Sequence, residues 1–258
     1  MPIHPSAVVD PTARIDATAD IGPFCVIGAD VEIGARTRLM ANIYVEGHTW
    51  IGEDNILFPY STVGVASQDL KYQGERAETR IGSRNRIREF VTIHRGTIGG
   101  GAVTRIGDDN LLMAYTHVAH DVLLKDNCIL ANGVTLAGHV AIGEYAVIGA
   151  FTGVHQFCRV GRHSMIGGYS VVTQDVLPYS TTVSDRVIKV FGANRTGLER
   201  RGYSKESIEP LQTCFRLLTR SNLNTSQAIA RIKEEIPETP EVGEVLAFIA
   251  ESQRGVIR

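Results

Sequence analysis

The amino-acid sequence predicts an all-β solenoid plus α-helices: a parallel β-helix of six-residue repeats, followed by a helical appendage. Branched aliphatic residues recur at every sixth position from Ile3 to Val63 and again from Ile106 to Val172. Glycine often follows the aliphatic residue, and a small residue recurs at the fifth place of each hexad. At about 100° per residue an α-helix would scatter these aliphatics around its axis, and regular glycines would weaken one long strand. Short strands joined by regular turns satisfy both observations, with three hexads completing one triangular coil.

The solenoid is predicted to span residues 1–185, with two interruptions that we expect to be extruded loops. Residues 64–80, GVASQDLKYQGERAETR, have no aliphatic residue in register and are rich in charged and polar groups. The aliphatics then return until a glycine-rich stretch, residues 99–105 (GGGAVTR), shifts the register by one residue. Loops on a rigid scaffold often carry binding residues, so both segments are candidates for ligand contacts.

A change of periodicity after residue 185 predicts that residues 186–258 form a small helical domain. Ser204 is suited to cap one helix, and Thr225 or Ser226 is suited to cap another. Prolines then separate these two helices from a third segment with helical apolar spacing.

Composition is ordinary for a globular protein, with 43% apolar and 21% charged residues in a chain of 258. The formal charge of −2 gives no basic field that would favour nucleic acid or an anionic membrane. The first residues do not form a secretory signal and no apolar run is long enough to span a membrane, so we expect a cytoplasmic protein. The cysteines show no paired spacing and are predicted to be free thiols, three of them packing at the small fifth place. These three are Cys25, Cys128 and Cys158, and the fourth cysteine is Cys214.

Histidines are predicted to gather on one strip of the solenoid, because residues three hexads apart stack one coil above the other. From His120 the column runs to Gly138 and then to Gln156. Four of the eight histidines belong to this column or lie beside it. They are His117, His120, His139 and His155.

This strip is suited to acyl or proton transfer. A neutral imidazole can remove a proton from a hydroxyl group, and Asp121 beside His120 can fix its tautomer and favour the imidazolium. The backbone N–H of Gly138 can approach an oxyanion closely, because glycine has no side chain. No serine or cysteine with a matching base stands out, which favours direct attack by the acceptor over a covalent intermediate. Two alternatives stay open: a catalytic metal site built from three histidines, and solvated turn histidines without chemistry.

Six long strings carry a resemblance to a known family. They are QDLKYQGE (68–75), NRIREFVTIHRGT (85–97), DNLLMAYTHVAHD (109–121), CILANGVTLAGHV (128–140), VHQFC (154–158) and GLERRG (197–202). Over nearly its full length the chain resembles the bacterial UDP-N-acetylglucosamine O-acyltransferases that start lipid A biosynthesis. The resemblance implies a left-handed β-helix, an exception to the usual right-handed crossover, with C-terminal helices. It also implies a homotrimer with active sites between neighbouring subunits.

The implied reaction moves a 3-hydroxyacyl group from acyl carrier protein to the glucosamine 3-hydroxyl of UDP-N-acetylglucosamine, with no cofactor and no metal. By the resemblance, His120 is the general base, Asp121 its partner and Gly138 the oxyanion donor. Contacts with the sugar nucleotide or the acyl donor are implied for Gln68, Asp69, Lys71, His117, His139, His155, Gln156, Asn194 and Arg200. Arg201 is placed to meet the acidic carrier protein.

Gly168 occupies the place where the family's acyl-length ruler is expected, and a groove left open by glycine suits a chain of about fourteen carbons. The chain departs from the pattern at LPYSTTVSDRVIKVFG (177–192), where related acyltransferases commonly carry a Gly-Asn-Pro-like turn. We therefore expect a local difference over residues 178–193.

Other functions remain open on the sequence alone. The enzyme could be an N-acyltransferase or accept a 3-amino analogue of the sugar. A metal-dependent hydratase of the γ-carbonic anhydrase type shares this solenoid, although the helical C-terminal region and the QDLKY loop speak against it. A catalytically silent trimer that binds sugar nucleotides is the third class.

Overall fold

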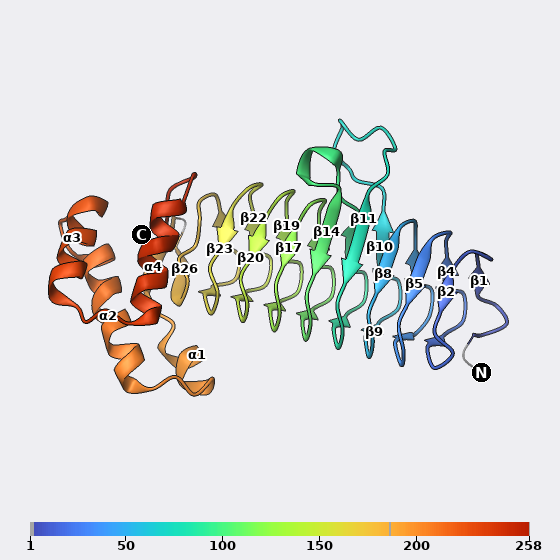
Figure 1. Cartoon of the computed structure of the whole chain (residues 1–258), viewed down its shortest axis with the longest axis horizontal. Coiled ribbons are helices and arrows are strands. Elements are labelled where there is room, and N and C mark those ends of the chain that lie inside the picture. Colours follow the sequence, from blue (N-terminus) through green and yellow to red (C-terminus); the bar gives the residue numbers. More distant parts are fainter. Residues whose placement is uncertain (1–2, 186, 258) are drawn as a thin grey trace.

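The computed structural model describes residues 3–185 and 187–257, and in it the chain winds into a long three-sided prism (Figure 1). Each complete coil adds one short strand to each of three parallel sheets, in a fixed order. Backbone N–H groups of one coil donate to carbonyl groups of the next, as from Gly149 to Ile166 at 2.8 Å. The coils wind in the left-handed sense, so the predicted fold class is confirmed.

The three sheets run along the prism and take every third strand of the chain as far as β25, after which β26 and β27 both join the third sheet. The first sheet contains β1 (Val8–Val9), β4 (Val26–Ile27), β7 (Tyr44–Val45), β10 (Thr62–Val65), β13 (Thr92–His94), β16 (His117–Val118), β19 (Thr135–Leu136), β22 (Gly153–Val154) and β25 (Val171–Val172). The second contains β2 (Arg14–Ile15), β5 (Val31–Ile33), β8 (Thr49–Ile51), β11 (Glu78–Ile81), β14 (Val103–Ile106), β17 (Leu123–Leu124), β20 (Ala141–Ile142) and β23 (Arg159–Val160). The third contains β3 (Asp20–Ile21), β6 (Arg38–Leu39), β9 (Ile56–Leu57), β12 (Arg86–Ile87), β15 (Leu111–Leu112), β18 (Ile129–Leu130), β21 (Val147–Ile148), β24 (Met165–Ile166), β26 (Ser180–Asp185) and β27 (Val187–Ala193).

The repeated aliphatic residues fill the interior of the prism. From Ile21 onward they are almost completely buried, as Leu57 and Leu130 at 0% exposure illustrate. Burying such a side chain is worth roughly 1.5–3 kcal/mol before chain entropy is counted, so the column stabilises the solenoid along its length. The three aliphatics of the first coil are less buried, with Ile3 at 39% exposure, because no coil stacks beneath the first one. All four cysteines are free and buried, as predicted.

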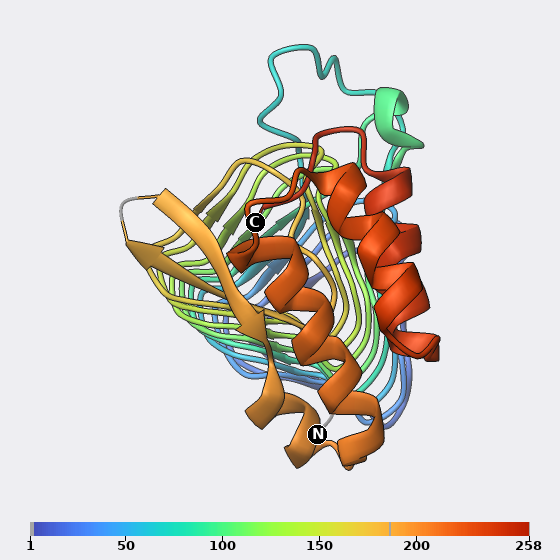
Figure 2. The same ribbon diagram turned by 90° about the vertical axis from the view of Figure 1, so that its left-hand side faces the viewer.

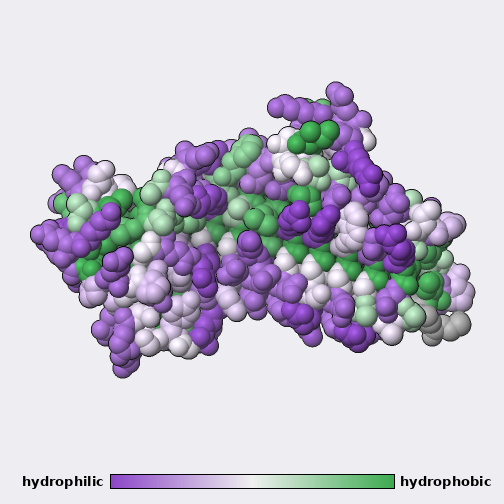
Figure 3. All heavy atoms as spheres, in the orientation of Figure 1, coloured by the Kyte–Doolittle hydropathy of each residue, from purple (hydrophilic) through white to green (hydrophobic). Residues whose placement is uncertain are grey.

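Two loops protrude from one shared corner of the prism, between the first and second sheets (Figures 1 and 2). The first spans residues 66–77, inside the predicted segment 64–80, because β10 and β11 extend into that segment from both sides. The second spans residues 95–102 and contains a short 3-10 helix, η1 (Ile98–Gly100). We expected it at 99–105, but residues 103–105 pair with Glu78–Arg80 as part of β14. Figure 3 shows that the loops are largely hydrophilic, while apolar residues form a lengthwise band along the visible face.

The chain leaves the solenoid through an antiparallel strand pair. β26 pairs in parallel with β24 and antiparallel with β27. The predicted domain boundary between residues 185 and 186 therefore falls within this pair, at Arg186, which lies outside the described residues. The first helix begins later, at Arg195. Residues 178–193 thus include most of this strand pair, and the difference from related acyltransferases expected there stays a prediction.

Four helices follow within the described residues and cover the C-terminal end of the prism (Figure 2). They are α1 (Arg195–Arg200), which the sequence did not predict, α2 (Lys205–Arg220), α3 (Thr225–Glu235) and α4 (Pro240–Glu251). Ser204 caps α2 as predicted. The cap of α3 is Asn224 and not Thr225 or Ser226, because Asn224 and Gln227 exchange side-chain and backbone hydrogen bonds in a capping box. None of these helices is long and apolar enough to cross a bilayer.

Candidate active site

Turns from three successive coils lie below the extruded loops at the corner between the first and second sheets, which we call the histidine corner. The N–H of His139 donates to the carbonyl of His120 at 3.1 Å, and the N–H of Phe157 donates to the carbonyl of Gly138 at 3.2 Å. The stacking expected from the repeat is therefore observed. The corner comprises His120, Asp121, Gly138, His139, His155 and Gln156.

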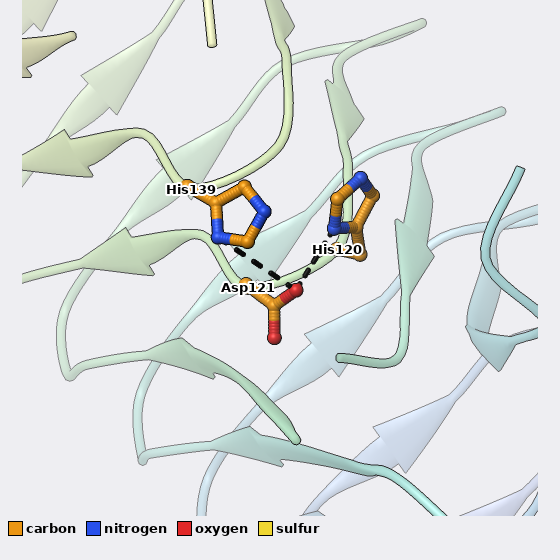
Figure 4. A group of neighbouring side chains, drawn as sticks. All are labelled: His120, Asp121 and His139. Carbon is orange, nitrogen blue, oxygen red and sulfur yellow. Dashed lines mark hydrogen bonds and ion pairs between the residues drawn. The ribbon is translucent and has the colours of Figure 1, made fainter. Parts of the chain in front are cut away.

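His120 and Asp121 form a hydrogen-bonded pair in the first of these turns (Figure 4). Nδ1 of His120 lies 2.8 Å from Oδ2 of Asp121, whose side chain is only 1% exposed. The hydroxyl of Thr97 donates to the same oxygen at 2.6 Å, and its N–H donates to both carboxylate oxygens. An ionised carboxylate only accepts hydrogen bonds, so in a neutral His120 ring the proton lies on Nδ1 and Nε2 keeps a lone pair.

The Nε2 edge of His120 faces Gly138 on the next coil. A Cβ at Gly138 would lie 2.5 Å from Nε2 and 2.4 Å from Cε1 of His120, so a side chain there would displace the imidazole. Gly138 is buried, and its N–H donates no hydrogen bond within the described part of the chain. An N–H without an internal partner beside a basic nitrogen is suited to bind a developing oxyanion. The roles predicted for His120 and Gly138 are compatible with this geometry and stay predictions.

His139 lies between His120 and an aromatic ring of the third turn. Its imidazole meets that of His120 edge to face at 5.0 Å and stacks on Phe157 at 4.4 Å. Its Nδ1 is 3.9 Å from Oδ2 of Asp121, beyond hydrogen-bond distance. Burial lowers the pKa of His139, which favours the uncharged ring at neutral pH.

Two further histidines line the first sheet next to the corner. Nδ1 of His117 lies 2.7 Å from the hydroxyl of Thr92, and the rings of His117 and His94 meet edge to face at 4.8 Å. Burial lowers the pKa of His117 and lowers that of His94 to about 4. Burial therefore favours the uncharged form of these two imidazoles and of His139 near pH 7.

The loops and the corner enclose a cleft of about 390 Å³. Its walls include Asp69, Lys71, Tyr72, Thr97, His139 and Phe157. The structure thus brings Asp69 and Lys71, predicted from the first loop, next to His139. Gln68 is exposed on the same loop, and His155 and Gln156 are exposed in the third turn.

The predicted residues of the helical domain lie elsewhere in the chain. Asn194, Arg200 and Arg201 line a hollow of about 860 Å³ over the third sheet. Asn194 is buried and caps α1, accepting from the N–H of Gly197 and donating to the carbonyl of His163. Arg201 lies over the ring of Tyr145, with its guanidinium carbon 5.0 Å from the ring centre. Within one chain these residues do not reach the histidine corner.

Gly168 also lies apart from the corner, in the exposed turn that joins the third sheet to the first after β24. A Cβ at this position would lie 3.1 Å from the carbonyl oxygen of Ala150 and closer to no other atom. A larger side chain would therefore project outward into the space beside the solenoid.

Sequence reasoning missed three residues of the site. Thr97 holds Asp121, His94 supports His117, and Phe157 stacks on His139. Thr97 had a partial signal, because it precedes the glycine-rich break in the repeat. Phe157 follows Gln156 in the predicted column, whereas nothing in the hexad pattern distinguishes His94.

His120, Asp121 and His139 are also the one described group that could hold a metal ion, with ligand atoms within 4.8 Å of one another. The carboxylate already accepts hydrogen bonds from Thr97 and His120. Binding of a metal to Nδ1 of His120 would have to displace the proton that joins it to Asp121. The hydrogen-bonded pair is therefore the arrangement that these residues favour.

Known proteins share this fold and much of this sequence. A family model described as domain 2 of UDP N-acetylglucosamine O-acyltransferase matches residues 175–257, and a model of bacterial transferase hexapeptides matches residues 104–138 and 139–174. An acyl-[acyl-carrier-protein]–UDP-N-acetylglucosamine O-acyltransferase from Thermodesulfovibrio yellowstonii is 46% identical over 222 residues, 86% of either chain. The solved UDP-N-acetylglucosamine O-acyltransferase from Moraxella catarrhalis is 41% identical, with a TM-score of 0.95 over 100% of both chains. The UDP-N-acetylglucosamine acyltransferase from Bacteroides fragilis is 41% identical, with a TM-score of 0.97 over 99% of this chain and 100% of its own.

The buried histidines predict a loss of stability in mild acid. The unfolded chain protonates His94 near pH 6.5, but the folded chain does so only near pH 4, so the unfolded state binds more protons between these values. Stability therefore falls as the pH drops from about 6.5 to about 4, by on the order of 3 kcal/mol for His94 alone. Urea unfolding at a series of pH values measures this dependence. His94→Asn should make it shallower, and an unchanged dependence would contradict a buried neutral His94.

Proposed function

The chain belongs to the family of acyl-[acyl-carrier-protein]–UDP-N-acetylglucosamine O-acyltransferases, and from this premise we propose its reaction and mechanism. It transfers a 3-hydroxyacyl group from acyl carrier protein to the glucosamine 3-hydroxyl of UDP-N-acetylglucosamine. This is the committed entry to lipid A biosynthesis, and its place is the cytoplasm. The observation that carries the mechanism is the His120–Asp121 pair, whose free Nε2 faces Gly138.

The proposed reaction needs no covalent enzyme intermediate. Nε2 of His120 takes the proton of the sugar 3-hydroxyl as its oxygen attacks the thioester carbonyl carbon. Asp121 stabilises the imidazolium that forms, and the N–H of Gly138 binds the oxyanion of the tetrahedral intermediate. When the intermediate collapses, the C–S bond breaks, and the carrier-protein thiolate takes the proton from His120. The base is thereby restored without any group supplied by a cofactor or metal.

Substrate contacts are proposed on chemical grounds. Lys71 supplies a cation at the cleft and Asp69 a carboxylate that can accept from sugar hydroxyls. Further hydrogen-bonding groups around the corner are offered by Gln68, His117, His139, His155 and Gln156. Asn194 and Arg200 reach the nucleotide, where the guanidinium suits a pyrophosphate, and Arg201 meets the acidic carrier protein.

The separation of these two sets of residues supports the homotrimer that we propose. Asn194 and Arg200 lie over the third sheet, on a different face from the histidine corner. A complete site therefore requires a neighbouring copy that brings its third sheet against the corner. The outer face of that sheet carries apolar side chains suited to such packing. They are Leu111, Ile129, Val147 and Met165.

Replacing the base tests the mechanism. We expect His120→Ala to lower kcat by at least about a hundredfold, because general-base catalysis is lost, while the affinity for UDP-N-acetylglucosamine changes little. The assay uses purified protein, the UDP-sugar and a panel of 3-hydroxyacyl carrier proteins, with products read by mass spectrometry. His4→Ala, at an exposed histidine near the N-terminus, is the matched control. Near-normal turnover of His120→Ala would exclude this base.

A metal-dependent reaction is distinguished in the same assay. Turnover that survives a strong chelator, in protein without stoichiometric zinc, agrees with the proposal. Chelator-sensitive turnover that zinc restores would instead favour a metal held by His120, Asp121 and His139.

Mixed trimers test whether one site uses two copies. We expect His120→Ala and Arg200→Ala each to be weakly active alone, and an equal mixture, unfolded and refolded together, to recover activity. A site that takes His120 from one copy and Arg200 from the next is intact at about a quarter of the interfaces in random mixed trimers. Each variant refolded alone is the control. Failure of the mixed trimers to gain activity would place all required residues in one chain.

The acyl-length role of Gly168 is tested by filling its space. Gly168→Met should lower kcat/KM for the longest accepted acyl chain by more than about tenfold and spare shorter chains, because the side chain occupies the end of the groove. Gly243→Met, at an open glycine on α4, is the control. Equal loss for all chain lengths would contradict a ruler at Gly168.

A further inference from the structure

The carboxylate of Asp121 is held by a part of the chain that does not belong to the repeat. Thr97 donates its N–H to Oδ1 at 2.9 Å and to Oδ2 at 3.1 Å, and its hydroxyl to Oδ2 at 2.6 Å. Thr97 belongs to the second extruded loop, residues 95–102. The same residue thus supplies a backbone donor and a side-chain donor to one carboxylate. Oδ2 also accepts a hydrogen bond from Nδ1 of His120.

The backbone of Asp121 is fixed by the strand that follows this loop. Its N–H donates to the hydroxyl of Thr104 in β14 at 2.8 Å. Asp121 itself adopts a left-handed conformation with φ of 59°, which aspartate tolerates better than most residues. Residues 97–104 therefore hold both the backbone and the side chain of Asp121.

Close approach of the loop depends on Gly100. A Cβ at Gly100 would lie 2.1 Å from Cγ of Asp121, which no real side chain could accept. A Cβ at the neighbouring Gly99 would meet no atom within 4 Å. The loop is closed on itself by a hydrogen bond from the N–H of Ala102 to the carbonyl of Thr97 at 2.8 Å. The two adjacent glycines thus have different surroundings, and only one of them packs on the carboxylate.

This contact decides which histidine Asp121 serves. Oδ2 lies 2.8 Å from Nδ1 of His120 but 3.9 Å from Nδ1 of His139. A carboxylate free to rotate could pair with either ring, because both nitrogens lie near it. Three hydrogen bonds from Thr97 hold the carboxylate in the orientation that pairs with His120, and the loop shields it from water.

We infer that the 95–102 loop is a clamp on Asp121, and that Thr97 is a positioning residue that directs this carboxylate to His120 and away from His139. The inference rests on the proposed function, in which His120 is the base. In this inference the glycine-rich break in the repeat allows Thr97, a donor outside the solenoid, to reach the buried carboxylate of Asp121.

The first test exchanges the hydroxyl. Thr97→Val removes one donor at nearly constant volume, and Thr97→Ser retains it. We expect Thr97→Val to lower kcat by about tenfold with KM for the UDP-sugar unchanged within about twofold, and Thr97→Ser to retain most activity. Nitrogen NMR of the imidazoles in the full-length protein should show the Nδ1–H tautomer of His120 in the parent and a mixture of tautomers in Thr97→Val. A purely structural role would not alter the tautomer.

The second test uses the adjacent glycines. Gly100→Ala should displace the carboxylate and reproduce the mixed tautomer of His120, with kcat lowered by at least about tenfold. Gly99→Ala should leave the tautomer of His120 as in the parent. Circular dichroism and the oligomeric state identify any variant that fails to fold, and Thr97→Val then carries the test.

The outcomes separate this inference from the proposed mechanism. If His120→Ala is inactive but Thr97→Val and Gly100→Ala keep the parent kcat and tautomer, the clamp is wrong and the base stands. If His120→Ala is active, His120 is not the base. The inferred role of Thr97 in catalysis is then also wrong, even if Thr97→Val changes the tautomer of His120.

Discussion

The hydrogen bonding between successive coils is the constraint on which the rest of the structure depends. Most strands contain only two or three residues, too few to hold a register alone, but each pairs with equivalent strands above and below. The repeat of this pairing puts Gly138 directly over His120 and sets the ring against the glycine backbone. A site built on such a ladder is rigid, because moving one turn would break hydrogen bonds in both neighbouring coils.

This constraint also explains why most of the fold could be predicted. Every inward position has nearly the same surroundings, so the six-residue pattern of aliphatics can be recognised from the amino-acid sequence alone. Loop boundaries were less predictable, because strand pairing continues past the apolar pattern. Glu78 and Arg80 point outward and Val103 is only half-buried, yet all three belong to β11 or β14. The exit strands β26 and β27 lack the repeat altogether and were not foreseen as a pair.

The site residues that could be predicted are likewise those that belong to the repeat. His120, Gly138 and Gln156 could be placed together by counting along the repeat, because equal spacing becomes proximity in a solenoid. Thr97 could not, because its loop interrupts the count and its contact with Asp121 depends on the path of that loop. Asn194 and Arg200 could not be placed by counting either, because they lie outside the repeat. Because these two residues lie far from the corner within one chain, they support a site that is shared between neighbouring copies.

The neutral imidazoles around His120 complete the electrostatics of the site. During the proposed reaction His120 becomes positive while Asp121 is negative, and the pair is nearly neutral overall. A positive His139, with its ring 5.0 Å away, would oppose that step by about 3 kcal/mol at an effective dielectric constant near 20. That repulsion corresponds to more than about a hundredfold in rate. Because burial lowers the pKa of His139, His117 and His94, the neighbours stay uncharged near pH 7 and the charge on His120 is opposed by none of them. The packing that buries these rings therefore supports proton uptake by His120, as does its hydrogen bond to Asp121.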